Sequence, residues 1–189
     1  MTGAGRATPS RRAGGAGART ARARPGDRVY TVTPSPLGGL VVVGDGEALT
    51  GLWFLAKHRW FDGIDDRWLH DPVPLAPVSE QLAAYFAGEL RRFDLPLALD
   101  GTPFQRRVWQ ALTAIPYGTT TSYSALAEGL GRPAGARAVG AANGRNPISI
   151  VVPCHRLVGA TGDLVGYGGG LDTKRRLLAH ERGQRSVIG

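Results

Sequence analysis

The chemistry that this sequence could support centres on one thiol. Cys154 is the single cysteine of the chain and lies in the segment SIVVPCHRLV, directly before His155 and Arg156. A thiolate is the nucleophilic form of cysteine, and a nearby base or positive charge lowers the pKa of the thiol. The base is itself oriented by a third group, often a carboxylate. Glu181, in the later segment LLAHERG, could supply that group, so the residues allow a Cys–His–Glu relay.

The apolar segment before Cys154 predicts a buried strand that ends at the thiol. Side chains alternate between the two faces of a strand. His155 would therefore reach the sulfur only if the chain turned at Pro153 or if a water bridged the two groups. The alternative is that Cys154 is an inert buried side chain, His155 a hydrogen-bonded bystander and Glu181 a solvated residue. The residues alone do not separate these interpretations.

The composition is that of a globular protein rich in turns. Of 189 residues, 42% are hydrophobic and 41 are Gly or Pro (28 and 13), which suits one large domain or two small ones. One cysteine excludes an internal disulfide and a cysteine-rich zinc site. No apolar run approaches the ~20 residues of a membrane span, and no apolar segment marks a secretory signal. We therefore expect no metal, no membrane contact and a reducing, cytoplasmic setting.

The first 26 residues are predicted to be a disordered basic tail. They contain six arginines and no acidic residue, so they carry six of the eight net positive charges and leave about +2 on the body. Such a tail could add sequence-independent affinity for nucleic acid. A biased extension without a specific role and a transit peptide are the alternatives.

Residues 27–100 are predicted to form a small structural domain. Short β-rich runs separated by Pro/Gly turns favour an antiparallel meander, and a helical period follows. No charged constellation there suggests chemistry. The predicted elements are strands at 29–33, 39–43 and 52–55, a helix near 77–88, and a further strand at 94–100.

Residues 101–189 carry sharper helix signals. The segment TPFQ predicts a capping box with Thr102 as N-cap and Gln105 at N3. Two short helices follow, Tyr123–Gly129 with Ser122 as N-cap and a second over 136–143. Because the turn between them contains glycine, the pair suggests a helix-turn-helix.

The second of these helices is unusual because nearly all its side chains are small. After Arg137, the segment AVGAANG (138–144) offers no long apolar or polar reader. A flat, small face permits close approach to a DNA minor groove, with Arg137 as the single long probe. Tight packing against another helix is the alternative.

The C-terminal stretch predicts a Gly-rich loop, like a wing, followed by a helix. Asp172 is the expected N-cap and Gly183 the expected C-cap. The run Lys174–Arg176 could contact phosphate, or could simply be a solvated face.

A set of linked motifs in register favours an active thiol over an inert one. The segment PCHR (153–156) follows NPI (146–148) and precedes GYGGGLDTKRRLL (166–178) and HE (180–181), while FQRRVW, IPYGTTTSYSALA and ARAVGAANGRNP stand in order before them. This set resembles the O6-alkylguanine-DNA alkyltransferases, the methylated-DNA–protein-cysteine S-methyltransferases of direct DNA repair. The resemblance is dense over 101–183 and compatible over 27–100.

The resemblance implies an α/β (α+β) fold in two parts. A small ribonuclease H-like α/β domain (27–100) would precede a helical winged-helix, or helix-turn-helix, DNA-binding domain (101–189) that carries the active cysteine. The structural zinc of some relatives, which needs further cysteines, would be absent here.

The resemblance also implies the reaction. The methyl (alkyl) group of O6-methylguanine would pass to Cys154 in a single irreversible turnover after the base is flipped out of the duplex. O4-methylthymine is a further possible substrate. His155, through a water, would take the thiol proton and Glu181 would orient His155. Asn146 would tie the preceding loop, and Tyr123 would crowd the target phosphate and protonate the leaving guanine. No cofactor is needed.

The same resemblance implies the DNA-facing residues. Arg137 would fill the space left by the extruded base, and the backbone of Cys154 and Leu157 would read the edge of guanine. Gly168 stands where certain relatives place a serine that contacts the guanine oxygen, so only a backbone amide could donate there. The expected DNA-binding residues are Arg137, Tyr123, Ala138, Ala141, Asn143 and Gly144, and the expected base-binding residues are Leu157, Tyr167 and Gly168.

Double-stranded DNA containing O6-alkylguanine is the expected partner of a monomer, with cooperative clustering on DNA as a further option. Three alternatives remain open: a cysteine hydrolase using Cys154, His155 and Glu181, a non-catalytic binder of alkylated DNA, and a winged-helix regulator. The presence of Cys154 argues against the binder, because alkyltransferase-like binders lack it. The small helix argues against the regulator, which would need long polar side chains for sequence readout.

Overall fold

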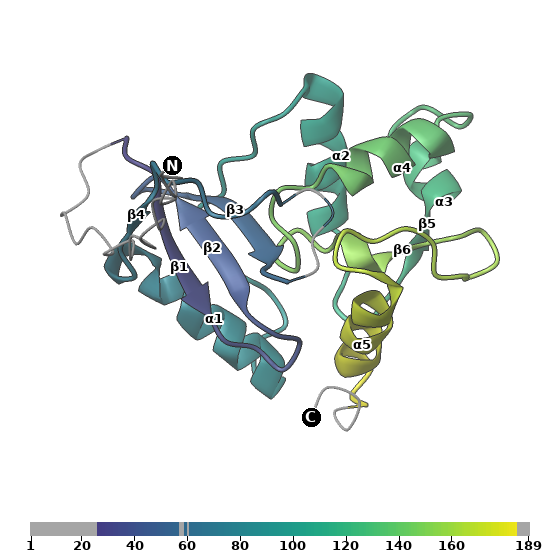
Figure 1. The fold of residues 1–189 in the computed structure, drawn as a ribbon. Helices are drawn as coiled ribbons and strands as arrows, with labels where there is room; N and C mark the ends of the chain where they lie inside the picture. The colour runs from purple at the N-terminus through teal and green to yellow at the C-terminus, as the bar shows by residue number, and fades with distance from the viewer. Residues whose placement is uncertain (1–25, 57–58, 60, 185–189) are drawn as a thin grey trace, which may run out of the picture.

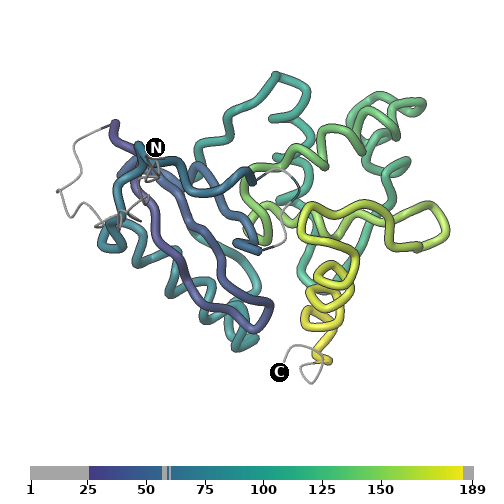
Figure 2. Tube along the Cα trace, viewed as in Figure 1, coloured from purple at the N-terminus to yellow at the C-terminus, as the bar shows by residue number. Residues whose placement is uncertain are grey.

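The computed structural model describes residues 26–56, 59 and 61–184 of the chain. The predicted basic tail, apart from Gly26, lies outside the described residues. Two domains lie side by side, the N-terminal one built around a sheet and the C-terminal one around short helices (Figures 1 and 2). This arrangement confirms the predicted α/β domain followed by a helical domain.

The N-terminal sheet contains the three predicted strands and a short fourth. Its order is β3-β2-β1-β4, in which β2 pairs antiparallel with both β1 and β3, and β4 pairs parallel with β1. The strands are β1 (Val29–Thr33), β2 (Leu40–Gly44), β3 (Leu49–Phe54) and β4 (Leu69–His70).

Helix α1 (Ala76–Ala87) covers one face of this sheet (Figure 1). It follows a 3-10 turn, η1 (Val73–Leu75), and ends at Gly88, whose φ of 75° lies in the left-handed region that glycine adopts without a steric penalty. The segment expected as a strand at 94–100 forms only one bridge, between Leu97 and Leu49. Pro96, which has no N–H to donate, limits the ladder there.

The C-terminal domain begins with α2, and its capping box is the predicted one. Thr102 accepts a hydrogen bond from the Gln105 amide at 3.3 Å, and Gln105 Oε1 accepts one from the Thr102 amide at 2.8 Å. The elements of this domain are α2 (Pro103–Thr113), β5 (Thr121–Ser122), α3 (Tyr123–Gly129), α4 (Ala136–Gly144), η2 (Cys154–Arg156), β6 (Leu157–Val158) and α5 (Leu171–Glu181).

The two-stranded sheet of this domain places the start of α3 beside the cysteine. Strands β5 and β6 pair in parallel, with Thr121 opposite Leu157 and Ser122 opposite Val158. Because β6 directly follows η2 and α3 directly follows β5, this pairing brings Tyr123 to the segment that contains Cys154.

The strand predicted before Cys154 is wrong. Residues 149–153 form turns, and the loop contacts the edge of β3, where Leu52 donates to Pro147 O at 2.9 Å and Ser149 donates to Leu52 O at 3.0 Å. Pro153 (φ −81°, ψ 62°) has the inverse γ-turn conformation, and the Cys154 amide donates to Val152 O at 2.8 Å. The chain therefore does turn at Pro153.

Helix α5 begins earlier than predicted. Gly170, with a φ of 88°, is the N-cap, and Asp172 lies inside the first turn. Its acidic side chain still favours the helix start through the macrodipole. At the other end Arg182 is the C-cap and Gly183 follows with a φ of 83°. In the described part of the chain, none of the helices has the length and apolarity to span a bilayer.

The capping box gives a stability prediction. Replacing Thr102 by Ala removes the side-chain acceptor of the Gln105 amide, so we expect the free energy of unfolding to fall by about 1 kcal/mol. Urea unfolding followed by tryptophan fluorescence measures this loss. The matched variant Thr102→Ser keeps the hydroxyl and should stay close to the parent. Equal losses in both variants would show that the cap is not the cause.

Candidate active site

The carboxylate of Glu181 lies at the centre of a buried network at the end of α5. His155 Nε2 lies 2.7 Å from Glu181 Oε1, and the Tyr85 hydroxyl donates to the same oxygen at 2.8 Å. Arg156 donates Nε to Oε2 at 2.9 Å and Nη2 to Oε1 at 3.0 Å. The Gly118 amide donates to Oε2 at 3.1 Å. These contacts occupy both oxygens of the carboxylate.

The charges of this network determine which groups are protonated. Burial alone would raise the pKa of Glu181, but His155 and Arg156 together hold it well below its usual range. Burial lowers the pKa of His155, so its imidazole is neutral near pH 7. A neutral imidazole that donates from Nε2 to the carboxylate presents Nδ1 as an acceptor. His155 Nδ1 is buried and makes no hydrogen bond with the residues that the structure describes.

The thiol of Cys154 needs a base. Burial raises its pKa, while the side chain of Asn146 and the positive charge of Lys174 act in the opposite direction. The resting group is therefore the thiol, which is not the nucleophilic form. The neutral His155 follows it in the chain, and His155 Nδ1 carries no hydrogen bond from the residues that the structure describes.

Asn146 holds the loop that leads to Cys154. Its Nδ2 donates to Val152 O at 2.9 Å, and its Oδ1 accepts from the Ile148 amide at 3.0 Å. Ile150 in this loop has a φ of 70°, which is rare for a β-branched residue. Two bonds from one buried side chain oppose the strain of that backbone.

Lys174 does not point toward solvent, contrary to its interpretation as a phosphate contact. It is fully buried, and its Nζ donates to Leu157 O at 2.6 Å and to Val165 O at 2.8 Å. Burial lowers its pKa to about 8. The long side chain joins β6 to the middle of the Gly-rich loop (residues 159–170), so it orders the loop beside the cysteine.

Cys154 lines a pocket of about 400 Å³ between α4, the start of α3 and the Gly-rich loop. The Tyr123 hydroxyl lies at this pocket and donates to Val165 O at 3.2 Å. Burial raises the pKa of Tyr123 to about 12, so the phenol keeps its proton. The predicted residues that line the pocket are Cys154, Tyr123, Ala141, Asn143, Gly144, Tyr167 and Gly168.

The remaining DNA-facing predictions fall on two sides of α4. Arg137, Ala138 and Ala141 are exposed together on one face. Asn143 faces the other way and is buried, because the helical period places it with Val139 on the core side. Asn143 therefore belongs to the pocket and not to the exposed face.

Leu157 is not among the residues that line the pocket, so the role of its backbone in reading the base stays a prediction. Its amide donates to Cys154 O to close η2, and its carbonyl accepts from Lys174. Both backbone groups are thus used inside the protein. The Gly168 carbonyl accepts from the Arg59 amide at 3.0 Å, and Arg59 also lines the pocket.

Two residues of the site were missed from the sequence, Arg156 and Tyr85, and a third, Lys174, was given a different role. The position of Arg156 beside His155 was a usable signal. Tyr85 gave no signal, because it lies 96 residues before Glu181 and in the other domain. Among the described residues, no three side chains of His, Cys, Asp or Glu gather as a metal site.

Comparison with known proteins matches both domains. Residues 28–99 match the ribonuclease-like domain of 6-O-methylguanine DNA methyltransferase, and residues 103–183 match its DNA-binding domain. The chain belongs to this family. The methyltransferase thus performs direct-reversal DNA repair by alkyl transfer to a cysteine, the activity numbered EC 2.1.1.63.

Individual relatives agree over most of the chain. A methylated-DNA–protein-cysteine methyltransferase of Mycolicibacterium paratuberculosis is 53% identical over 153 residues, 81% of this chain and 92% of that one. One of Methanosarcina acetivorans is 47% identical over 152 residues, 80% and 97% of the two chains. The crystal structure of Mycobacterium tuberculosis OGT in complex with DNA has a TM-score of 0.78 at 48% identity, covering 84% of this methyltransferase and 98% of that chain.

Glu181 predicts a specific pH dependence of stability. Its pKa is lower in the folded protein than the ~4.3 of an unfolded glutamate. Its contribution is therefore complete above about pH 5 and is lost as the pH falls toward the folded pKa. Glu181→Gln leaves Arg156 without a counter-charge, so we expect a loss of about 3–5 kcal/mol at pH 7.

The difference in the free energy of unfolding between Glu181→Gln and the parent should narrow steadily below about pH 5, as measured by urea unfolding over a pH series. The control is Glu128→Gln on the exposed side of α3, which should track the parent throughout. A gap that stays constant with pH would contradict the proposed charge state of Glu181.

Proposed function

We propose that this methyltransferase takes the alkyl group from O6 of an alkylguanine in duplex DNA onto Cys154. The observation that best supports this proposal is the surroundings of the single cysteine. Cys154 lines a pocket and precedes a neutral His155, whose Nε2 is bound to the buried carboxylate of Glu181. A pocket of about 400 Å³ suits one extruded base. The DNA-bound M. tuberculosis relative supports DNA as the partner.

The proton transfers follow from the charge states. His155 accepts the thiol proton, directly or through a water, and Glu181 with its donors stabilises the imidazolium. The thiolate attacks the alkyl carbon, so an S–C bond forms while the C–O6 bond breaks. The electron pair of that bond stays on guanine. Tyr123, whose phenol is protonated at rest, passes its proton to the departing base and recovers one from His155, which gives up the proton that it took from the thiol.

The DNA is held through shape and charge. Ala138 and Ala141 leave the exposed face of α4 flat, which permits a close approach to the minor groove, and Arg137 projects from the same face. Arg137 enters the duplex and occupies the space of the extruded nucleotide. The base-independent character of such contacts suits a protein that inspects any sequence.

The product explains the stoichiometry that we propose. A thioether on Cys154 is stable to hydrolysis, and the chain holds no second cysteine to exchange with it. Each molecule therefore reacts once. We further propose that the protein acts as a cytoplasmic monomer, with clustering on DNA decided by measurement of binding cooperativity.

The adduct is a direct test. Incubation with duplex DNA containing O6-methylguanine should add one methyl group per protein, on the peptide that contains Cys154, as measured by mass spectrometry. Cys154→Ser should gain nothing. A cysteine hydrolase would instead release the group and react repeatedly, so product formation beyond one equivalent would overturn the proposal.

The role of Arg137 in extrusion predicts a selective defect. Arg137→Ala should slow the repair of duplex DNA by about 10-fold or more, because extrusion costs a few kcal/mol and the variant lacks the side chain that stabilises the extruded state. The reaction with free O6-benzylguanine, which needs no extrusion, should change little. Arg175→Ala on the exposed face of α5 is the control for lost charge. Equal slowing of both substrates would refute this role.

A further inference from the structure

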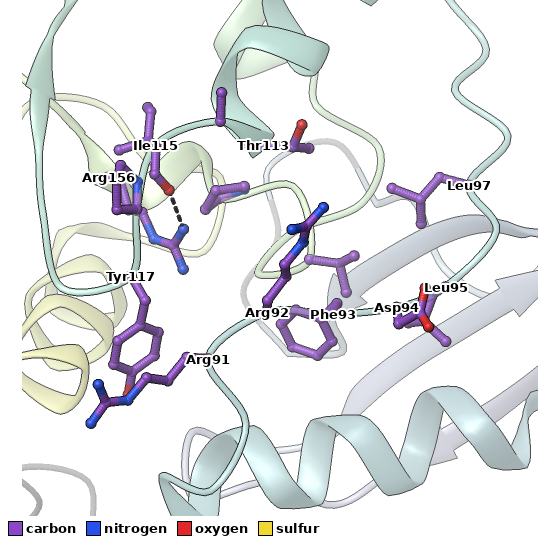
Figure 3. Close-up of a pocket in the computed structure, with 14 residues that line it drawn as sticks. Arg91, Arg92, Phe93, Asp94, Leu95, Leu97, Thr113, Ile115, Tyr117 and Arg156 are labelled. Atoms are coloured by element: carbon purple, nitrogen blue, oxygen red, sulfur yellow. Dashed lines mark hydrogen bonds between the residues drawn. The ribbon is translucent and has the colours of Figure 1, made fainter.

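A second cavity lies behind the active site, at the junction of the two domains. It has a volume of about 680 Å³ and is lined by the segment after α1, the end of α2 and the turns around Cys154 (Figure 3). Small-molecule sites are typically 300–1,000 Å³ and occur preferentially between domains. Cys154 does not line this cavity, although Pro153 and Arg156 on either side of it do.

Arg156 brings unused hydrogen-bond donors to this cavity. A guanidinium has five N–H donors. Three of those on Arg156 are used, two by Glu181 and one by Ile115 O at 2.6 Å. The other two make no hydrogen bond with the residues that the structure describes. Because Arg156 is only 6% exposed, donors left over in such a site favour an acceptor that enters the cavity.

The opposite wall adds positive charge and flat apolar surface. Arg92 and Arg156 reach the cavity from two different walls, and Arg91 lies over the ring of Tyr117 at 5.8 Å (Figure 3). Phe93, the residue after Arg92, adds a half-buried ring to the lining. Asp94 is the one acid of the lining, and it lies beyond Phe93 on the side away from Arg156 (Figure 3).

The wall that carries these residues is held in place. Gln81 of α1 donates from Nε2 to Asp94 O at 2.9 Å, and its Oε1 accepts from the Asp94 amide at 2.8 Å. Both bonds involve the Asp94 backbone, so they fix the segment without using its carboxylate. A preformed wall lowers the ordering cost of binding a ligand.

We propose that this cavity binds a small organic phosphate with a planar ring, of the nucleoside monophosphate class. The phosphate contacts Arg92 and the two remaining donors of Arg156, and the ring packs on Phe93. Guanidinium groups bind phosphate through charge-assisted hydrogen bonds, and the apolar wall adds affinity that inorganic phosphate cannot gain.

Such a ligand would act on the reaction through Arg156. Burial is the main cause of the low pKa of His155, and the positive charge of Arg156 adds to it. An anion beside Arg156 offsets that charge and raises the pKa of His155. A more basic His155 takes the Cys154 proton more readily, so the bound ligand speeds alkyl transfer.

Binding is tested by calorimetry on the full chain with three probes: AMP, inorganic phosphate and adenosine. AMP should bind with a dissociation constant on the order of 0.1 mM and more tightly than inorganic phosphate or adenosine. Arg92→Gln should weaken AMP about 10-fold, whereas Arg175→Gln, an equal loss of charge on the exposed face of α5, should not. Asp94→Asn should lower the dissociation constant of AMP, because it removes the negative charge of the lining.

Three outcomes would overturn the site: no binding of AMP, equal effects of Arg92→Gln and Arg175→Gln, or displacement of AMP by unmodified duplex DNA. The last would assign these arginines to a DNA surface. Arg156 itself is left unchanged, because its loss would strand the charge of Glu181.

The link to the reaction is tested by single-turnover methylation of Cys154 with saturating AMP. The rate near pH 7 should rise about threefold, which corresponds to half a pKa unit on His155, and the rise should vanish in Arg92→Gln. Because Arg92 lies outside the relay, its basal rate should match the parent. An unchanged rate at full occupancy would overturn the coupling. AMP binding is measured by calorimetry without DNA. A failure of AMP to bind is therefore distinguishable from a failure of Cys154 to accept the methyl group.

Discussion

The ion pair between Arg156 and Glu181, buried with His155 in contact, is the interaction on which the site depends. Burial of a carboxylate is costly unless charge and hydrogen bonds meet both of its oxygens. Here a guanidinium, an imidazole, a phenol and a backbone amide do so. The resulting low pKa of Glu181 keeps it anionic. That anion selects the tautomer of His155 and leaves Nδ1 as an acceptor, the atom that we propose takes the thiol proton.

Burial also keeps Cys154 in its unreactive thiol form at rest. The pKa of Cys154 is raised, so little thiolate is present until a base takes the proton. A protein that reacts once is inactivated by any adventitious electrophile. A resting thiol limits that loss, and under the proposed mechanism it is activated only through His155 once a base fills the pocket.

The N-terminal domain takes part in building the site. Tyr85 of α1 donates to Glu181, β3 pairs with the loop at Ile148, and Phe54 lies against Tyr167 of the Gly-rich loop at 6.2 Å. Gly169 permits this last contact, because a Cβ there would lie 2.7 Å from the Phe54 ring. The small domain thus positions the carboxylate and the pocket wall, although it supplies no reacting atom.

Local patterns in the sequence determined the helices, the first three strands, the capping box at Thr102 and the candidates Cys154, His155 and Glu181, because these depend on short-range periodicity, caps and adjacent motifs. The turn at Pro153, the burial of Lys174, the inward face of Asn143 and the bond from Tyr85 were decided only by tertiary structure. The apolar run before Cys154 has the same sequence pattern as a strand, although it forms a buried loop. The charged run that contains Lys174 has the pattern of a solvated face, although Lys174 is buried. The folding of the C-terminal domain supplies the carbonyls that bind Lys174, and the packing of the two domains supplies the partner that Tyr85 meets 96 residues away.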